Sequence, residues 1–195
     1  MSMRFALDAI APSPWKNGGG FTREIAAWPP GASLDAFDWR ISVADIAADG
    51  PFSAFPGIDR QIALLHGAGV VLRAADGGWR HQLACRGEPF AFAGEDAVLA
   101  TLTDGPSRDF NVMTRRGRCH ARIDAMRHAF SVEPGGHAVV VLVVEGEWHL
   151  HGADPLRPSD GIWWDAGAAG EREVISPARV ASLCLRVQIE PEQHR

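Results

Sequence analysis

The sequence predicts an all-β protein, and two observations lead to this fold class. Glycine and proline, 21 and 13 of the 195 residues, divide the chain at intervals of about 8–12 residues, a spacing typical of β-sandwiches and barrels. The runs between them are short and rich in Val, Ile, Leu, Phe and Trp, which favour strands. Few segments keep an apolar period of 3.6 residues long enough to predict a helix.

The apolar runs define twelve expected strands. They cover residues 21–27, 39–46, 61–65, 70–74, 79–83, 90–92, 98–102, 109–114, 121–123, 138–144, 147–150 and 181–189. Residues 124–130 fit neither a strand nor a helix clearly.

A weak internal repeat indicates a duplicated β unit. The stretch IALLHGAGVVL at 62–72 is similar to VVLVVEGEWHL at 140–150. GEPFAFAG (87–94) and DGIWWDAG (160–167) follow the two copies, and each copy then runs into another apolar strand. Two such units predict two packed barrels in one chain. The element order resembles the cupin double-stranded β-helix in a bicupin-like arrangement. We expect residues 1–118 to form the barrel with a ligand pocket and residues 119–195 to form a structural barrel.

Composition argues against several classes of protein. The net charge of −5 and the pI of about 5.9 do not suit a nucleic-acid surface, which needs clustered basic residues. The N-terminus lacks the apolar region of a signal peptide, and the run 138–144 is too short to span a bilayer. Cys85, Cys119 and Cys184 have no CxxC spacing and are interpreted as reduced thiols of a cytoplasmic protein.

The metal-binding motifs of many cupins are missing from both repeats. Arg60 occupies the place of the expected glutamate in the first repeat, and Val139 occupies it in the second. His149 and His151 form an H-x-H pair, but they follow the glycine turn and have no acidic residue at a supporting spacing. Because a metal needs three or four converging ligands, we expect no intrinsic metal and no other cofactor.

The segment PWKNGGGFTREI at 14–25 contains Lys16, the only lysine in the chain. It is not a phosphate-binding loop, since it lacks G-K-[ST] and a strand-like run follows it. The glycines permit positive φ or a close backbone approach. Lys16 is interpreted as a contact for a small anion, and the alternative is an ordinary flexible loop.

Two alternating segments supply further candidate ligand contacts. Strand periodicity places Arg40 and Ser42 on one face of segment 35–46, and it places Asp109 and Asn111 on one face of segment 107–117. Arginine offers paired donors to a carboxylate. Asp109 could orient Arg40 or accept a ligand N–H, and in the alternative interpretation these residues are solvated on the outer surface. There is no recognisable nucleophile with an adjacent base.

These segments together resemble the HutD/Ves family of bacterial cupin-like proteins. The resemblance rests on PWKNGGG-TREI, on FDWRIS followed by DGPFS-FPG-DR, and on DFNVM-RRG, and it covers about residues 5–118 with a weaker extension to 187. It implies a two-barrel cupin without a metal. It also implies an accessory, non-catalytic role in histidine utilisation, in which binding of N-formylglutamate or urocanate limits flux.

The motifs and the alternating segments give one set of expected ligand-binding residues. They are Lys16, Asn17, Thr22, Glu24, Arg40, Ser42, Arg60, Asp109 and Asn111. No catalytic residue is assigned, and the expected partner is a small anionic metabolite.

Two other functions stay open from the sequence alone. The chain could be a metal-independent isomerase or hydrolase of a small acid, with Glu24 or Asp109 as the base. It could also be a stress-related interaction module, with which its seven tryptophans, including Trp163 and Trp164, are compatible. A homodimer is possible because the faces of β-sandwiches often pair.

Overall fold

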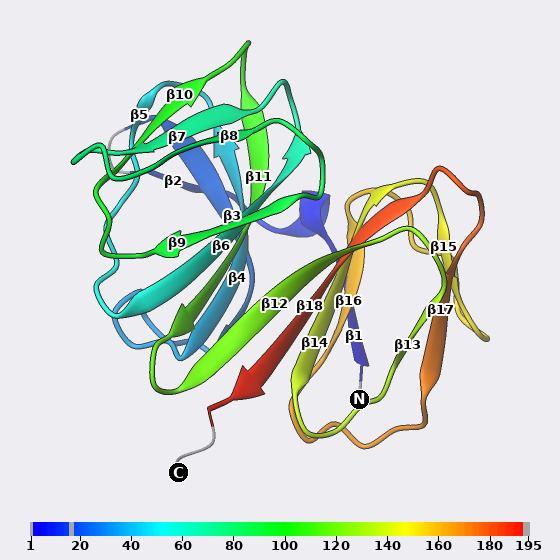
Figure 1. The fold of residues 1–195 in the computed structure, drawn as a ribbon. Coiled ribbons are helices and arrows are strands. Elements are labelled where there is room, and N and C mark those ends of the chain that lie inside the picture. Colours follow the sequence, from blue (N-terminus) through cyan, green and yellow to red (C-terminus); the bar gives the residue numbers. More distant parts are fainter. Residues whose placement is uncertain (1, 16–17, 193–195) are drawn as a thin grey trace. The chain divides into compact units, whose positions relative to one another are not determined.

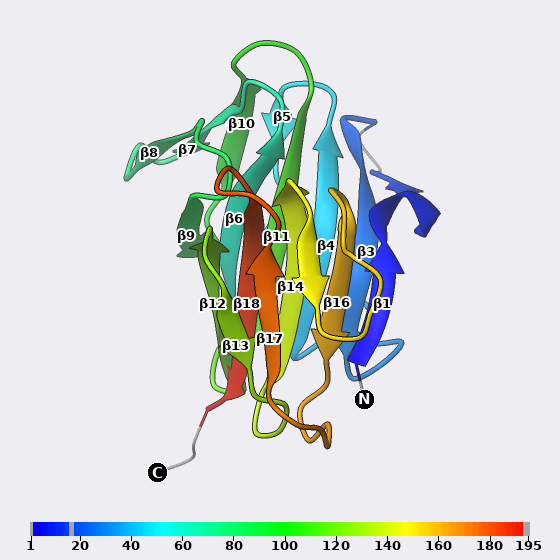
Figure 2. The same ribbon diagram turned by 90° about the vertical axis from the view of Figure 1, so that its right-hand side faces the viewer.

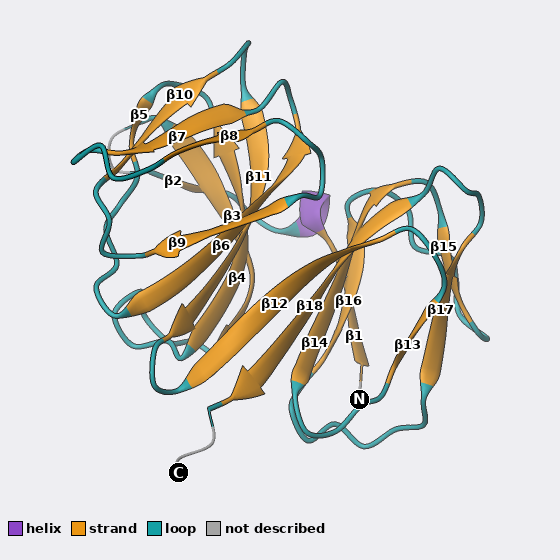
Figure 3. Ribbon diagram, in the orientation of Figure 1, coloured by secondary structure: helices purple, strands orange, loops and turns teal. Residues whose placement is uncertain are grey.

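The computed structural model describes residues 2–15 and 18–192, and nearly all of their regular structure is β-strand (Figure 3). The one helical element in these ranges is the 3-10 turn η1 (Leu7–Ala9). No helix in this part of the chain is long and apolar enough to cross a membrane. The prediction of an all-β protein is confirmed.

The chain folds into two compact units (Figure 1). The N-terminal unit is Ile10–His120, and the C-terminal unit combines Met1–Ala9 with Ala121–Arg195. The sequence repeat indicated a division at 118/119, with the first residues of the chain in the first domain. In the structure the strand at 2–6 is part of the C-terminal unit, because it pairs with residues 160–164 of that unit.

The N-terminal unit contains two antiparallel sheets. The six-stranded sheet has the order β2 (Ser13–Pro14), β3 (Gly20–Trp28), β4 (Trp39–Ile46), β11 (Ser107–Arg115), β6 (Ile58–His66) and β9 (Pro89–Ala93). The four-stranded sheet has the order β5 (Gly50–Pro51), β10 (Val98–Leu102), β7 (Val70–Ala74) and β8 (Arg80–Leu83).

Apolar side chains from both sheets form the core of this unit. Ile62 and Leu64 of β6 are fully buried, and they belong to one cluster with Val70, Leu72 and other residues of β7, β8, β9 and β10. Each side chain of this kind stabilises the fold by about 1.5–3 kcal/mol when it is fully buried. The inner face of the six-stranded sheet is therefore the face on which Ile62 and Leu64 lie.

The C-terminal unit also contains two antiparallel sheets, and Figure 2 shows the strands of its larger sheet side by side. The five-stranded sheet has the order β1 (Ser2–Ala6), β16 (Asp160–Trp164), β14 (Ala138–Glu145), β18 (Leu183–Pro191) and β12 (Cys119–Met126). The three-stranded sheet has the order β13 (Phe130–Val132), β17 (Glu173–Pro177) and β15 (Trp148–Leu150). The core between them includes Val139, Val141, Trp148 and Trp164.

The repeat seen in the sequence corresponds to equivalent strands of the two units. Its first copy forms β6 and β7, and its second copy forms β14 and β15. Gly67 and Gly146 lie in the two connecting turns with φ of 97° and 76°, a region that favours glycine. The larger sheets of the two units therefore have matching strand orders, in which β9, β6, β11 and β4 correspond to β16, β14, β18 and β12.

The two closed barrels expected from the sequence are not formed. In the part of the chain that the structure describes, each unit has two separate sheets whose edge strands do not join. Edge strands β2 and β5 have two residues each, which is too little backbone to extend the pairing from one sheet to the other. The units are open sandwiches of the cupin-like type.

Candidate functional site

The inner face of the six-stranded sheet collects the polar residues that the sequence singled out. Asn111 pairs with Ile62 and Ser42, and Asp109 pairs with Leu64. Residues directly opposite each other in an antiparallel pair point to the same face, so these polar side chains share the face of the core residues. The same strand register places four more residues on this face, Thr22, Glu24, Arg40 and Arg60.

Arg60 is a buried cation with neutral partners. It is 5% exposed, and its Nη2 donates to the Oδ1 of Asn111 at 2.8 Å. Its Nη1 donates to the backbone carbonyl of Ser53 at 3.4 Å, and its Nε is buried without a partner. Among the described residues no carboxylate forms an ion pair with it.

Three phenylalanine rings surround the Arg60 guanidinium. Its Cζ lies 5.4 Å from the ring centroid of Phe52, 5.7 Å from that of Phe55 and 4.8 Å from that of Phe92. Burial, and secondly the positive charge of Arg40, lowers the pKa of Arg60 to about 9. The rings stabilise the cation through their negative faces, but they do not neutralise its charge.

Arg40 provides a second guanidinium next to Arg60. Its Nε donates to the Oε2 of Glu24 at 2.7 Å, and its Nη1 donates to the Oγ of Ser42 at 3.4 Å. The Arg40 side chain is 11% exposed and that of Glu24 is 46% exposed. The polar face therefore opens to solvent beside Glu24. The hypothesis that Asp109 orients Arg40 is not supported, since Glu24 is the acidic partner of Arg40.

Asp109 is fully buried. The hydroxyl of Ser107 donates to its Oδ1 at 2.8 Å, and its Oδ2 has no partner. Burial raises the pKa of this carboxyl to about 7, although the hydrogen bond from Ser107 acts in the opposite direction. A carboxyl with this pKa exchanges a proton near neutral pH.

Thr22 of β3 holds the side chain of Trp15 by a hydrogen bond. The indole Nε1 of Trp15 donates to the Oγ1 of Thr22 at 2.7 Å, and the Trp15 ring meets the Phe52 ring edge-on at 6.3 Å. Gly18 has a φ of 70°. A Cβ on Gly20 would lie 2.2 Å from the carbonyl oxygen of Asp45. Gly18 therefore provides a positive φ, and Gly20 allows the backbones of β3 and β4 to approach closely. Both roles were expected from the sequence.

Lys16 and Asn17, the other two expected contacts, lie outside the described residues. The remaining seven lie on one face of one sheet, but the aromatic cage of Arg60 was not expected. The sequence indicated only that Phe52 and Phe55 belong to a rigid loop and that Phe92 belongs to a repeat. The one sequence feature that could have predicted these ring contacts is the DGPFSAFPG segment, which has two phenylalanines shortly before Arg60.

The donors on this face suit an anion better than a metal. The charged side chains are two arginines and two carboxyls, of which Glu24 is paired and Asp109 titrates near neutrality. Within the described residues there is no group of three or more His, Cys, Asp or Glu that could hold a metal ion. Arginines with buried amide and hydroxyl neighbours are the usual donors to a carboxylate.

A family model and a curated relative each match most of this chain. A family model described as HutD matches residues 8–182. Protein Ves of Cronobacter sakazakii is 45% identical over 157 residues, which cover 79% of this chain and 82% of that protein.

Solved structures agree with this result. HutD of Pseudomonas fluorescens, determined in a formate condition, is 32% identical with a TM-score of 0.84, over 99% of this chain and 100% of that one. YlbA of Escherichia coli is 11% identical with a TM-score of 0.73, over 100% of this chain and 93% of that one, and it shows the fold alone.

Proposed function

Because this chain belongs to the HutD family of cupin-like proteins, we propose that it binds a small anionic metabolite of histidine breakdown. The binding site is the inner polar face of the N-terminal unit. Binding limits flux through the pathway, and the protein itself performs no reaction. The observation that carries this proposal is Arg60, a buried guanidinium whose hydrogen-bond partners are neutral.

The energetics of Arg60 favour an anionic ligand. A buried charge without a counter-ion is costly, and Arg40 adds repulsion, as the lowered pKa of Arg60 reflects. A carboxylate beside both guanidinium groups offsets both costs. The Nε of Arg60 is a further donor, which has no hydrogen-bond partner in the structure.

N-formylglutamate and urocanate are the proposed ligands. N-formylglutamate has two carboxylates for the two arginines and a formyl amide that can exchange hydrogen bonds with neutral groups such as Ser42 and Asn111. Urocanate has one carboxylate and an imidazole. Both fit a site with more positive than negative charge at neutral pH.

Asp109 supports a second candidate, a metal-independent isomerase or hydrolase acting on such an acid. Its carboxyl has a pKa of about 7 and one oxygen without a partner, which are properties of a general base. In this alternative the same arginines hold the substrate carboxylate, and Asp109 moves the proton.

We also propose a cellular and structural setting for the site. The two sandwiches are the two halves of a bicupin. The protein works in the cytoplasm, a setting that suits the reduced cysteines Cys85, Cys119 and Cys184.

Calorimetric titration followed by mass analysis tests the two functions. Purified protein is titrated with N-formylglutamate, urocanate, histidine and glutamate. Saturable binding of one acid that is recovered unchanged supports a binding protein. Conversion of the acid makes the protein an enzyme, and no binding at millimolar ligand contradicts both proposals.

A further inference from the structure

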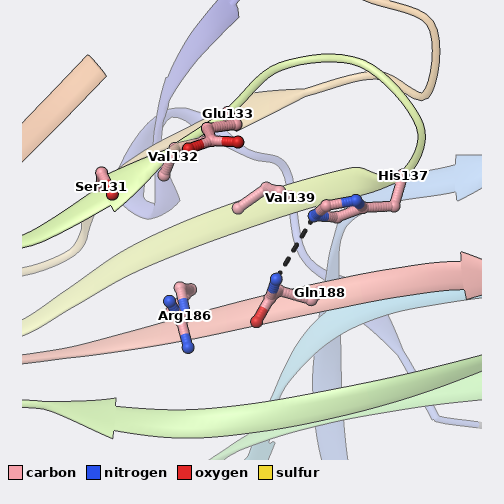
Figure 4. A pocket seen from close by; sticks show the side chains of 7 residues that line it. All are labelled: Ser131, Val132, Glu133, His137, Val139, Arg186 and Gln188. Carbon is pink, nitrogen blue, oxygen red and sulfur yellow. Dashed lines mark hydrogen bonds between the residues drawn. The ribbon is translucent and has the colours of Figure 1, made fainter. Parts of the chain in front are cut away.

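The C-terminal unit has a polar hollow of its own, with a volume of about 160 Å³ (Figure 4). Ser131 and Glu133 come from β13 and the residue after it, and Arg186 and Gln188 come from β18. His137 and Val139 lie between these two groups in Figure 4.

The hollow lies on the inner face of the five-stranded sheet. Gln188 pairs with Val139, and Arg186 pairs with Val141. Both valines belong to the core between the two sheets, so the two polar side chains project from the same face. Arg186 and Gln188 therefore lie at the polar edge of the apolar core.

This position is equivalent to the candidate site of the other unit. Strands β14 and β18 match β6 and β11 in the strand order of the two sheets. Arg186 lies opposite Val141 as Asn111 lies opposite Ile62. The same place on the sandwich is therefore polar in both units, although the residues differ.

Several polar groups at the hollow have hydrogen-bonding capacity to spare. The Nε of Arg186 is buried without a partner, while its Nη2 donates to the Oδ2 of Asp124 at 2.7 Å. The amide nitrogen of Gln188 lies 3.3 Å from the Nε2 of His137, so the amide oxygen of Gln188 is left as an acceptor. Glu133 supplies an exposed carboxylate.

The residues that line this hollow carry a different charge from those around Arg60 in the N-terminal unit. Asp124 pairs with the Nη2 of Arg186 only, and Glu133 adds a negative charge at the opposite side of the hollow (Figure 4). A dianion gains little from such a lining. A molecule with one positive and one negative group is complementary to it.

We propose that this hollow binds a small α-amino acid. The ligand carboxylate accepts from the guanidinium group of Arg186 and the hydroxyl of Ser131. The ligand ammonium group donates to Glu133 and to the amide oxygen of Gln188. A volume of about 160 Å³ holds roughly five waters at about 30 Å³ each, which is enough for a ligand of the size of alanine or serine.

Amide NMR spectra of the full chain test the chemical class of this ligand. Alanine is compared with propionate, which lacks the ammonium group, and with ethylamine, which lacks the carboxylate. We expect alanine alone to shift the amide signals of Ser131, Val139 and Gln188 in a saturable way. Equal shifts with propionate, or no shifts at these residues, would overturn the proposal.

Three variants test whether alanine binds in this hollow. Glu133→Gln should weaken alanine binding roughly tenfold, the loss expected for a charge-assisted hydrogen bond. Glu88→Gln removes an exposed carboxylate of the N-terminal unit, which does not line the hollow, and should leave the affinity unchanged. Arg40→Ala, in the other unit, should also leave it unchanged. If Arg40→Ala abolishes the shifts, or if the two glutamate variants behave alike, the assignment is wrong.

Discussion

Arg60 and Asp109 lie on the same buried face, and burial favours the neutral form of each. It lowers the pKa of Arg60 to about 9 and raises that of Asp109 to about 7. A core selected only for stability would avoid both groups. At the scale of single residues, their presence is the clearest mark of a functional site.

Asp109 should make stability depend on pH in a predictable direction. Its pKa is raised from an unfolded value of about 3.9 to about 7, so the proton stabilises the folded state below pH 4. That contribution is lost as the pH rises from 4 to 7. Asp109→Asn should therefore raise the free energy of unfolding at pH 8, by up to about 4 kcal/mol, and change it little at pH 4.

Chemical denaturation across this pH range measures the effect. Asp104→Asn, at an exposed loop position, is the control and should change stability little at any pH. A difference between Asp109→Asn and the unmodified protein that is the same at pH 4 and pH 8 would show that folding does not raise the pKa of Asp109.

At the scale of the strands, alternation explains why the site residues were largely recognisable. β4 and β11 alternate between polar and apolar residues, so the spacing alone places Arg40 with Ser42 and Asp109 with Asn111 on common faces. The cage of Arg60 has no such signal, since Phe92 reaches it through the pairing of β6 with β9. Such pairing between separate strands leaves no periodic pattern in the sequence.

Several missed strands have a similar cause. β1 pairs with β16, more than 150 residues later in the chain. In β17, only Ile175 is buried. Neither strand has an apolar alternation of its own. Residues 124–126 are the end of β12, a strand whose burial pattern is too irregular to separate it from a helix.

At the start of β3, Gly20 has no room for a side chain. A Cβ there would lie 2.2 Å from the carbonyl oxygen of Asp45, a backbone atom of the neighbouring strand. Gly20→Ala should force the strands apart and lower the free energy of unfolding by about 1–3 kcal/mol.

Gly50→Ala is the matched control for Gly20→Ala. No atom lies within 4 Å of a Cβ on Gly50, so that variant should be neutral or slightly stabilising. Calorimetric melting of both variants makes the comparison. Equal stability would mean that β3 and β4 can separate at little cost.

At the scale of the whole molecule, the fold class and the family were predictable, and the closure of the sheets was not. Motifs spread over the chain, from KNGGG to DFNVM, identify the family because their spacing is long and specific. Whether a sandwich closes into a barrel depends on the hydrogen bonding of short edge strands such as β2 and β5. Two residues carry too little sequence information to predict that.

The central claim is that the arginines of the inner face bind an anionic metabolite, and one titration tests it most directly. N-formylglutamate is titrated by calorimetry into the unmodified protein, into Arg40→Ala, and into Arg73→Ala as the control. Arg73 is an exposed residue of β7, so its loss removes the same charge away from the site.

We predict saturable binding to the unmodified protein and to Arg73→Ala. Binding to Arg40→Ala should be weaker by about 2–4 kcal/mol, which is roughly a thirty- to thousand-fold increase in Kd. The same affinity in all three proteins would contradict the account, because the ligand would then bind without Arg40, one of the two arginines of the proposed site.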